Sequence, residues 1–383
     1  MENHYDIKLV EPGFDSELTD LIIELDHLRK IKLGGSTHPR VFFQLKNIFH
    51  TLESIGSARI EGNNTTLAEY IETKIENKPT ESQNIKEIQN IEKAMVFVED
   101  NVADYSINRM FVSEMHRMIV DGLFPPPEGE GDRTPGEYRR VNVKIAQLDH
   151  VPPDYTRVAD YMVELFEFID REDSSKYDLL KIAIAHHRFV WIHPFGNGNG
   201  RAVRLFTYAM LVKLGFNVNV GRILNPTAVF CSNRDDYYHF LSKADNGETP
   251  DILRWCTYVL KGLKEEIDKI DNLSDYEYLK TEILVPTINF SLERKYITEI
   301  ESKVLKKVVD KQAIQAGDLK EIFKGKVSAE ISRQIRRLVD KKMLIPEKEG
   351  KRKYVIRFDN NYLLRGVINI LGKKGFLPVR DDQ

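Results

Sequence analysis

The sequence predicts a mainly α-helical protein that contains one β-hairpin and carries a winged-helix domain near its C-terminus. Apolar residues recur at helical spacing along most of residues 40–270. Within that stretch, only residues 136–145 follow a Pro-Gly turn with alternating apolar and polar residues, the pattern of a short hairpin exposed along one edge. From residue 297 onward, three short helical patterns precede a turn and a strand pattern, which is the order of a winged helix.

Four regions follow from these patterns. They are an N-terminal helical region (1–75), a helical core (76–275), the winged-helix domain (295–360) and a C-terminal tail (361–383). Apart from two helices around a central loop, the helices expected before the winged helix span residues 18–33, 40–60, 84–102, 107–120, 155–169, 224–244 and 250–270. Gly62 is expected to end the second of these, because glycine readily adopts the left-handed conformation found after helix ends.

Composition excludes few partners but indicates a cellular setting. The 383 residues carry 56 Lys and Arg against 59 Asp and Glu, a net charge of −3, so overall charge points to no partner. Cys231 and Cys256 are the only cysteines, and they provide neither metal-type spacing nor a disulfide framework. Since no apolar stretch is long enough for a signal core or a membrane span, we expect a cytoplasmic protein that does not bind membranes.

A glycine-rich stretch at residues 193–204 is the strongest functional signal. Gly196, Gly198 and Gly200 alternate there between two segments that are apolar on most sides and predict buried helices, the second ending at Gly215. Glycine tolerates left-handed dihedral angles, so consecutive backbone N–H groups can converge on one anion. The next helix starts at this loop and adds its positive dipole end. We therefore expect an anion-binding loop.

Three side chains at this loop carry charged or reactive groups. Arg201 and Arg204 lie three residues apart in a first helical turn, where the helix dipole disfavours positive charge. Either nearby carboxylates compensate these arginines or a polyphosphate does. His193 ends the preceding helix, and the ordinary pKa of histidine suits a general base.

Glu61 is the opposite anomaly, because it is a carboxylate expected at the end of a helix, where negative charge is disfavoured. It lies in the stretch from Ser57 to Gly62. Taken by itself, the residue is also consistent with an ordinary solvated carboxylate.

The loop at residues 193–204 resembles the signature of the Fic (filamentation induced by cAMP) family, H-x-F-x-[D/E]-G-N-G-R-x-x-R. Members of this family are helical enzymes that typically transfer AMP from ATP to a hydroxyl group of a target protein. The resemblance extends to the Pro135-Gly136 turn and covers roughly residues 40–270. It implies a Fic-type helical bundle in which the hairpin at 136–145 is a flap that aligns a segment of the target protein as an added strand.

The resemblance also implies roles for the loop residues. His193 would deprotonate the target hydroxyl for attack on the α-phosphate of ATP. Backbone N–H groups and both arginines would bind the phosphates, while Tyr238 is a candidate for the adenine pocket. The nucleotide-binding set implied in this way comprises Gly196, Asn197, Gly198, Asn199, Gly200, Arg201, Arg204 and Tyr238.

Asn197 departs from the family pattern, which has an acidic residue there that holds a magnesium ion on the phosphates. An amide oxygen is a weaker ligand than a carboxylate for this hard cation. Mg²⁺ remains expected, with Asn197 as a weak ligand and with phosphates and water supplying the other positions. Slow transfer, a different nucleotide, or loss of transfer with binding retained are the alternatives.

Residues 57–62 resemble the family's inhibitory motif, [S/T]-x-x-x-E-[G/N], at the position typical of the subclass with an N-terminal inhibitory helix. The resemblance implies that Glu61, in a motif that begins at Ser57, pairs with Arg204 and occupies the place of the γ-phosphate of ATP. Members of this subclass often pair, so a homodimer is one expected assembly.

The C-terminal domain indicates a further partner. Residues 301–360 hold 17 Lys and Arg against 9 Asp and Glu, a net charge of +8. Arg333, Arg336 and Arg337 lie on the third expected helix, and a basic third helix and wing are typical of DNA contact. Winged helices also serve as protein-docking modules, so charge alone leaves both partners open.

Three functions are therefore consistent with the sequence. The first is a self-inhibited protein adenylyltransferase that transfers AMP from ATP to a hydroxyl side chain of a target protein (AMPylation), with His193 as general base and Glu61 as the block. The second is a hydrolase that removes AMP from a modified protein. The third is a nucleotide-sensing, DNA-binding regulator with weak or lost transferase activity.

Overall fold

The structure, a computed structural model, describes residues 5–30, 36–76, 81–145, 149–216 and 223–377. It divides into two compact units, each of which is described by itself. Unit 1 comprises Met1–Lys32, His50–Thr65 and Thr80–Asp268, and unit 2 comprises Leu33–Phe49, Thr66–Pro79 and Lys269–Gln383.

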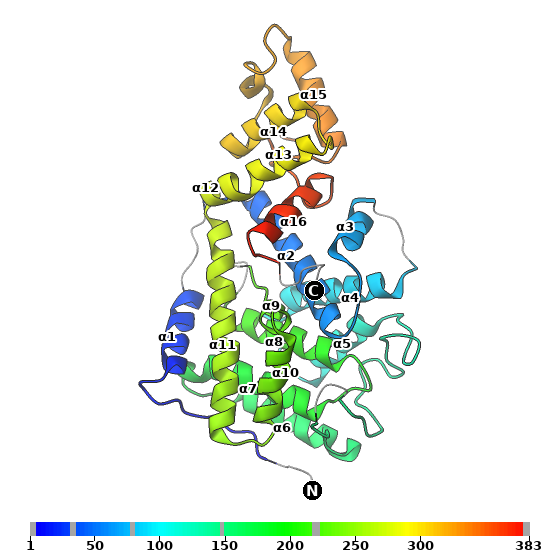
Figure 1. The fold of residues 1–383 in the computed structure, drawn as a ribbon, viewed down its shortest axis with the longest axis vertical. Coiled ribbons are helices and arrows are strands. Elements are labelled where there is room, and N and C mark those ends of the chain that lie inside the picture. The colour runs from blue at the N-terminus through cyan, green and yellow to red at the C-terminus, as the bar shows by residue number, and fades with distance from the viewer. Residues whose placement is uncertain (1–4, 31–35, 77–80, 146–148, 217–222, 378–383) are drawn as a thin grey trace. The chain divides into compact units, whose positions relative to one another are not determined.

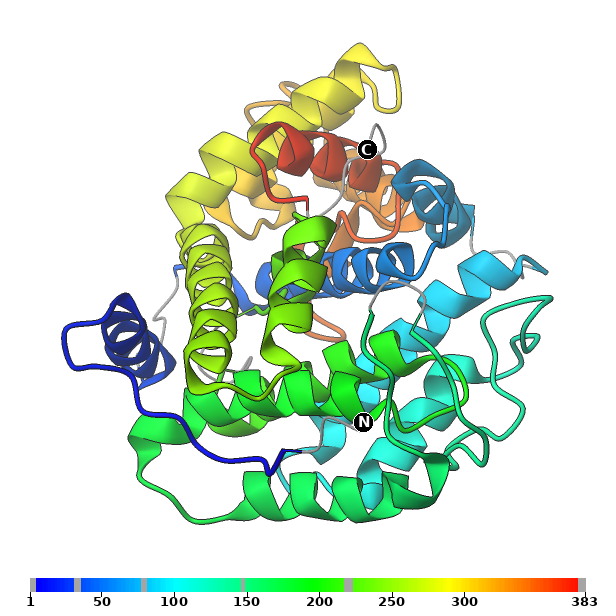
Figure 2. The same cartoon turned by 60° about the horizontal axis from the view of Figure 1, so that its bottom comes forward.

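The regular structure of unit 1 is helical (Figure 1). Its helices are α1 (Glu17–Lys30), the second half of α2 (Pro39–Ile60), α4 (Gln83–Asn101), α5 (Arg109–Val120), α6 (Val158–Asp170), α7 (Asp178–Ile192), α8 (Asn199–Leu214), α9 (Thr227–Cys231), α10 (Arg234–Ala244) and α11 (Thr249–Asp271). Helices α7 and α8 pack against each other, with α6 beside α7 and with α4 and α5 beside α8 (Figure 2). This arrangement places the loop between α7 and α8 among five helices.

Helices α7 and α8 are buried on nearly all sides, as their continuous apolar pattern predicts. The left-handed turn between them begins at His193 (φ +51°) and ends at Gly198 (φ +75°). Gly215, at φ +111°, follows the last residue of α8, and Gly62, at φ +104°, follows the end of α2. The predicted ends of these two helices are therefore confirmed.

Unit 2 is built from helices and one small sheet. Its elements are α3 (Leu67–Glu76), α12 (Tyr276–Tyr278), a π-helical turn (Leu279–Leu284), α13 (Val285–Glu293), α14 (Glu299–Lys311), a 3₁₀ turn (Ala316–Leu319), α15 (Ser328–Asp340), β1 (Leu344–Pro346), β2 (Tyr354–Ile356) and α16 (Leu363–Lys373). The two strands pair antiparallel, with Leu344 opposite Ile356. Ile314 forms an isolated bridge to Tyr354.

Polar side chains at helix starts explain several helix boundaries. Ser82, Asn108 and Asn233 accept hydrogen bonds from backbone N–H groups in the first turns of α4, α5 and α10. Thr298 and Glu301 form a reciprocal capping box at α14. Asn233 also explains why the single helix predicted for residues 224–244 is two helices, since its cap starts α10 anew after α9.

The predicted hairpin at residues 136–145 is wrong, because none of these residues lies in a strand. The Arg139 N–H donates to the Pro194 carbonyl (2.8 Å) and its guanidinium donates to further loop carbonyls, so this backbone pairs with a loop instead of a neighbouring strand. The described part of the chain has its one two-stranded hairpin at β1–β2 instead.

Two further findings concern the expected tail and membranes. Within residues 361–383, α16 buries Leu363, Val367 and Leu371 and packs against α13 of the same unit. Among the described residues, no helix combines the length and the apolar composition needed to cross a bilayer.

The contact between α13 and α16 gives a stability prediction. A Cβ on Gly366 would lie 3.0 Å from the Thr287 carbonyl oxygen, whereas one on Gly372 of the same helix would meet the flexible end of Leu377. Overpacking costs about 1–3 kcal/mol, and alanine gains roughly 1 kcal/mol over glycine in a helix. We expect Gly366→Ala to lower the thermal unfolding midpoint and Gly372→Ala to leave it unchanged or raised. Equal midpoints for the two variants would contradict the packing argument.

Candidate active site

The loop between α7 and α8 borders a cavity of about 280 Å³ within unit 1. Segments distant in sequence line it: the end of α2, the loop before residue 132, residues 143–145 and helix α10. The lining side chains and glycines that the sequence analysis singled out are Glu61, His193, Gly196, Asn197, Gly198, Asn199, Gly200, Arg204 and Tyr238. Ser57 and Arg201 are not among the residues that line this cavity.

The glycine loop is held in shape by two buried residues. Asn199 accepts a hydrogen bond from the Phe195 N–H and donates one to the Phe195 carbonyl, both at 2.9 Å. Phe195 is fully buried and stacks on the His116 ring with centroids 3.7 Å apart. The side chain of Asn199 therefore shapes the loop through both the oxygen and the nitrogen of its amide.

His116 is a loop-supporting residue that the sequence analysis did not assign to the site. The Gly136 N–H donates to its Nδ1 (2.8 Å), so the Nε2–H is the group that donates to the Asn197 carbonyl (2.9 Å). Burial lowers the pKa of His116 to about 4, which keeps this tautomer uncharged at neutral pH.

Arg139 connects residues 136–145, the segment predicted as a hairpin, to the end of α7. Its Nε donates to the His193 carbonyl (2.8 Å), and Nη2 donates to the carbonyls of Pro153 (2.6 Å) and Ile192 (3.3 Å). Cations bind well at helix C-termini, where unpaired carbonyls and the negative dipole end coincide. Residues 143–145 follow this anchor and line the cavity.

His193 is the first residue after α7 and has a left-handed backbone conformation. It lines the cavity beside Val190, the residue one helical turn before it. Burial lowers the pKa of His193 to about 4, so the ring is neutral at pH 7 and can accept a proton.

Arg204 is held from two sides by the end of α2. Nε donates to Ser57 Oγ (2.9 Å), Nη2 donates to the Ser57 carbonyl (2.8 Å), and Nη2 pairs with Glu61 Oε1 (2.7 Å). Burial opposes ionisation of Glu61, but attraction to Arg204 outweighs it and holds the Glu61 pKa below its ordinary value. A Cβ on Gly200 would lie 2.0 Å from Glu61 Oε1, so any larger residue there would force the Glu61 carboxylate to move.

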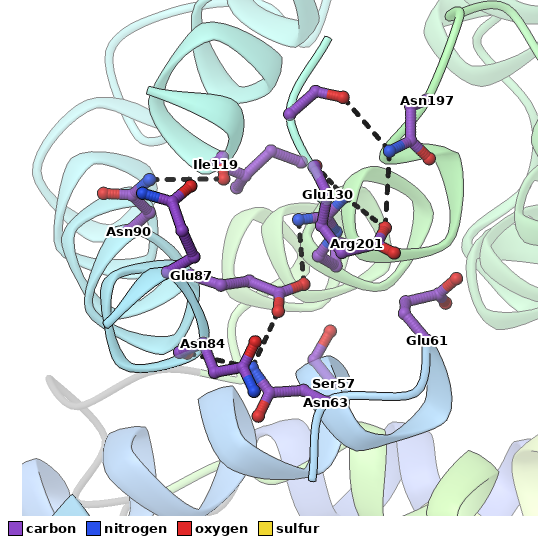
Figure 3. Close-up of polar contacts among 12 residues, drawn as sticks. Ser57, Glu61, Asn63, Asn84, Glu87, Asn90, Ile119, Glu130, Asn197 and Arg201 are labelled. Carbon is purple, nitrogen blue, oxygen red and sulfur yellow. Dashed lines mark hydrogen bonds and ion pairs between the residues drawn. The ribbon is translucent and has the colours of Figure 1, made fainter. Parts of the chain in front are cut away.

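Arg201 has a different environment from Arg204. Its side chain is fully buried, Nη1 forms an ion pair with Glu87 (2.8 Å), and Nη2 donates to the Glu130 carbonyl (2.6 Å) (Figure 3). Glu87 in turn accepts a hydrogen bond from the Asn63 amide (2.7 Å). Phosphate binding by Arg201 stays a prediction, and it requires these buried contacts to open.

Asn197 is surrounded by acidic residues from the loop before residue 133. Its N–H donates to Asp132 Oδ2 (2.8 Å), and its Nδ2 donates to the Gly131 carbonyl (3.1 Å) and to Glu130 Oε2 (3.3 Å). Its Oδ1 accepts no hydrogen bond from the described residues. Amide and carboxylate oxygens are ligands that Mg²⁺ accepts, so this donor set fits the expected ion.

The described residues contain no group of three His, Cys, Asp or Glu side chains that could hold a metal ion. A magnesium ion at Asn197 therefore needs phosphate oxygens and water to complete its coordination. This agrees with an ion that arrives with a nucleotide.

Tyr237 and Tyr238 complete one wall of the cavity. The Tyr237 hydroxyl is hydrogen-bonded to His186 Nε2 (3.0 Å) and is buried. Tyr238 is more open and lies beside the Arg234 guanidinium, 5.6 Å from its ring centre. Its predicted contact with adenine is consistent with this place but stays a prediction.

The sequence analysis did not assign Glu87, His116, Glu130 or Asp132 to the site. These residues come from α4, α5 and a turn-rich loop, and each lies more than sixty positions from the glycine loop. The available signal was weak: three acidic residues, Glu128, Glu130 and Asp132, alternate with glycine after a run of prolines. That pattern alone is typical of any solvated loop.

The fold and the site together define a helical domain in which a glycine-rich loop, a neutral histidine and a carboxylate-paired arginine face one cavity. Residues 106–211 match the model of the Fic/DOC family. This part of the chain, 106 of its 383 residues, is thus similar to the Fic/DOC family.

Comparisons with individual proteins agree with this assignment. The chain is 32% identical over 218 residues to protein adenylyltransferase Fic from Drosophila grimshawi, which covers 54% of this chain and 41% of that protein. A Fic family protein from Desulfovibrio desulfuricans G20 has a similar fold over 92% of this chain and 98% of its own, with a TM-score of 0.56 and 18% identity. A Fic domain containing signaling protein from Bacteroides thetaiotaomicron VPI-5482 matches over 68% and 97%, with a TM-score of 0.52 and 17% identity.

The environment of His193 gives a direct spectroscopic prediction. Because burial lowers its pKa to about 4, the neutral ring should persist as the pH falls from 8 to 5.5. An unperturbed histidine would be roughly nine-tenths protonated at the lower pH. Ring nitrogen chemical shifts from histidine-labelled protein measure this state, and a His193→Ala spectrum assigns the signal. A protonation midpoint near 6.5 would contradict the buried environment.

Proposed function

We propose that this protein is a self-inhibited protein adenylyltransferase that transfers AMP from ATP to a hydroxyl side chain of a target protein. The observation that carries this proposal is the cavity itself, where neutral His193 and the Glu61–Arg204 pair face the same glycine loop. The distant similarity to protein adenylyltransferases supports it. The match spans about two fifths of the length of that relative, so the activity is proposed for this chain on its own residues.

In this mechanism His193 accepts the proton of a serine, threonine or tyrosine hydroxyl. The hydroxyl oxygen attacks the α-phosphorus, the bond from that phosphorus to the bridging oxygen of the β-phosphate breaks, and pyrophosphate leaves. Backbone N–H groups around Gly198 and Gly200, at the start of α8, bind the phosphates. A bound magnesium ion would offset negative charge on the phosphates, and Asn197 is a residue that would hold it.

Inhibition follows from the contacts of Arg204. Its guanidinium is buried and its Nη2 is already paired with Glu61, so a γ-phosphate has to displace a carboxylate that the same cation holds ionised. Ser57 keeps its two hydrogen bonds to Arg204 in this exchange. In the proposed inhibited state, Glu61 therefore competes with the γ-phosphate for Arg204, and Ser57 keeps the arginine in place.

The proposed place for the target protein is the segment that follows Arg139. Val141 is exposed, residues 143–145 line the cavity, and Arg139 fixes the start of the segment beside His193. An extended peptide can add to such an exposed backbone through main-chain hydrogen bonds.

A label-transfer experiment tests the proposed reaction. We expect Glu61→Gly to raise transfer of label from α-labelled ATP to the protein itself or to a target by roughly tenfold or more, since each 1.4 kcal/mol of competing ion pair costs a factor of ten. His193→Ala in the same background should abolish the label. Absence of label from both the parent and the Glu61→Gly variant, with all four nucleoside triphosphates, would refute the transferase.

We also propose DNA binding by the C-terminal region, taken as a winged helix. The order of α14, the 3₁₀ turn, α15 and the β1–β2 hairpin supports this fold. On α15, Arg333, Arg336 and Arg337 are exposed, and none forms an ion pair with a described residue. Unpaired arginines along one exposed helix suit contact with DNA phosphates.

The salt dependence of duplex binding by the full chain tests this second proposal. Log affinity falls with log salt, and each lost phosphate contact should make this slope less steep by about 0.9. Changing Arg333, Arg336 and Arg337 to alanine should therefore reduce the size of the slope by roughly 2 to 3. Changing the exposed Lys8, Lys93 and Lys243 to alanine alters net charge equally and should not change the slope. Equal slopes for both triple variants, or no binding by the parent, would refute DNA contact by α15.

A further inference from the structure

The orientation of the Asn197 amide is fixed by what surrounds it. Only the NH₂ group can donate to both the Gly131 carbonyl (3.1 Å) and Glu130 Oε2 (3.3 Å), so the Nδ2 side faces these two oxygens (Figure 3). Oδ1 is left without a hydrogen bond from the described residues, and Asn197 lines the cavity. The amide oxygen is therefore available to a ligand of the loop.

An aspartate at position 197 would not fit this environment. It would lose both donated hydrogen bonds and place its oxygens against the Gly131 carbonyl and the Glu130 carboxylate. Like charges at this separation repel each other. Asn197 and Glu130 thus form a consistent pair in which the negative charge lies on residue 130.

Glu130 is held in position through its backbone. Its carbonyl accepts a hydrogen bond from Arg201 Nη2 (2.6 Å), and Arg201 is anchored in turn by buried Glu87 (2.8 Å). The Glu130 carboxylate is 3.5 Å from the same Arg201 nitrogen, and its side chain is 45% exposed. It lines the cavity beside Asn197, so a ligand in the cavity can reach it.

The local charges favour a cation. Arg201 is shared between Glu87 and Glu130, while Asp132 adds a third carboxylate that contacts the Asn197 N–H. His116 Nε2 lies 3.7 Å from Asp132 Oδ2 and contacts the Asn197 carbonyl. The carboxylates of Glu87, Glu130 and Asp132 therefore lie around Asn197 with one guanidinium, that of Arg201, so negative charge exceeds positive charge among these side chains.

We propose that Glu130 supplies the carboxylate that position 197 lacks, and that it binds, together with Asn197 Oδ1, the divalent cation of a metal–nucleoside triphosphate. Phosphate oxygens and water complete the coordination. This inference rests on the proposed function, because the ion enters with the nucleotide of that reaction.

Binding of α,β-methylene ATP, whose α-phosphate cannot be transferred, tests the role of Glu130 by isothermal titration calorimetry. In the Glu61→Gly background we expect Glu130→Gln to weaken binding in Mg²⁺ roughly tenfold, as loss of a metal partner typically does. In EDTA the same change should leave the affinity equal or higher, because it removes a negative charge near the phosphates. A purely structural role would weaken binding under both conditions.

Two further variants sharpen the result. Glu128→Gln alters an exposed carboxylate of the same loop and should leave both affinities unchanged. Combining Asn197→Asp with Glu130→Gln moves the carboxylate to position 197 and should restore the gain in affinity from Mg²⁺. An unchanged Mg²⁺ gain in the Glu130→Gln variant would overturn the inference while leaving the proposed function intact. No nucleotide binding by the Glu61→Gly protein in either condition would overturn the proposed function and the inference together.

Discussion

The site depends on how a buried guanidinium at the start of α8 is satisfied. Arg204 is 2% exposed and lies where the helix dipole already disfavours a cation. Leaving such a charge without a partner costs roughly 3–5 kcal/mol. Ser57 in the last turn of α2 and Glu61 just after the helix supply three oxygen atoms, so the end of this helix is fixed against the glycine loop by electrostatics.

Arg201 and Arg204 are both buried cations at the start of α8, and their charges are compensated by different partners. Arg201 pairs closely with buried Glu87 and with the Glu130 carbonyl, has the Glu130 carboxylate at 3.5 Å, and does not itself border the cavity. Arg204 has one partner, Glu61, that borders the cavity, and this is the partner that a phosphate would replace in the proposed mechanism. Two arginines three positions apart therefore differ in position: Arg201 is held behind the loop, and Arg204 lines the cavity.

Local patterns explain how much could be predicted from the sequence. The buried helices α7 and α8, the left-handed ends at Gly62 and Gly215 and the cavity position of His193 follow from periodicity and glycine chemistry within a few residues. The alternation of apolar and polar residues at 136–145 wrongly predicted a hairpin, because Arg139 bonds to loop carbonyls and not to a neighbouring strand. Glu87 and Glu130 reach the loop from distant segments, and no local pattern marks which surface carboxylate becomes buried beside an arginine.

A continuous polar network joins the two ends of the proposed switch. Asn63, two residues after Glu61, donates to Glu87, which pairs with Arg201, which holds Glu130 beside Asn197 (Figure 3). These contacts do not include the Glu61 carboxylate. Exchange of Glu61 for a phosphate therefore changes one partner of Arg204 and leaves the cation-binding side of the cavity assembled. The proposed inhibition and the proposed metal binding therefore depend on different side chains, Glu61 and Glu130, so each can be tested by its own substitution.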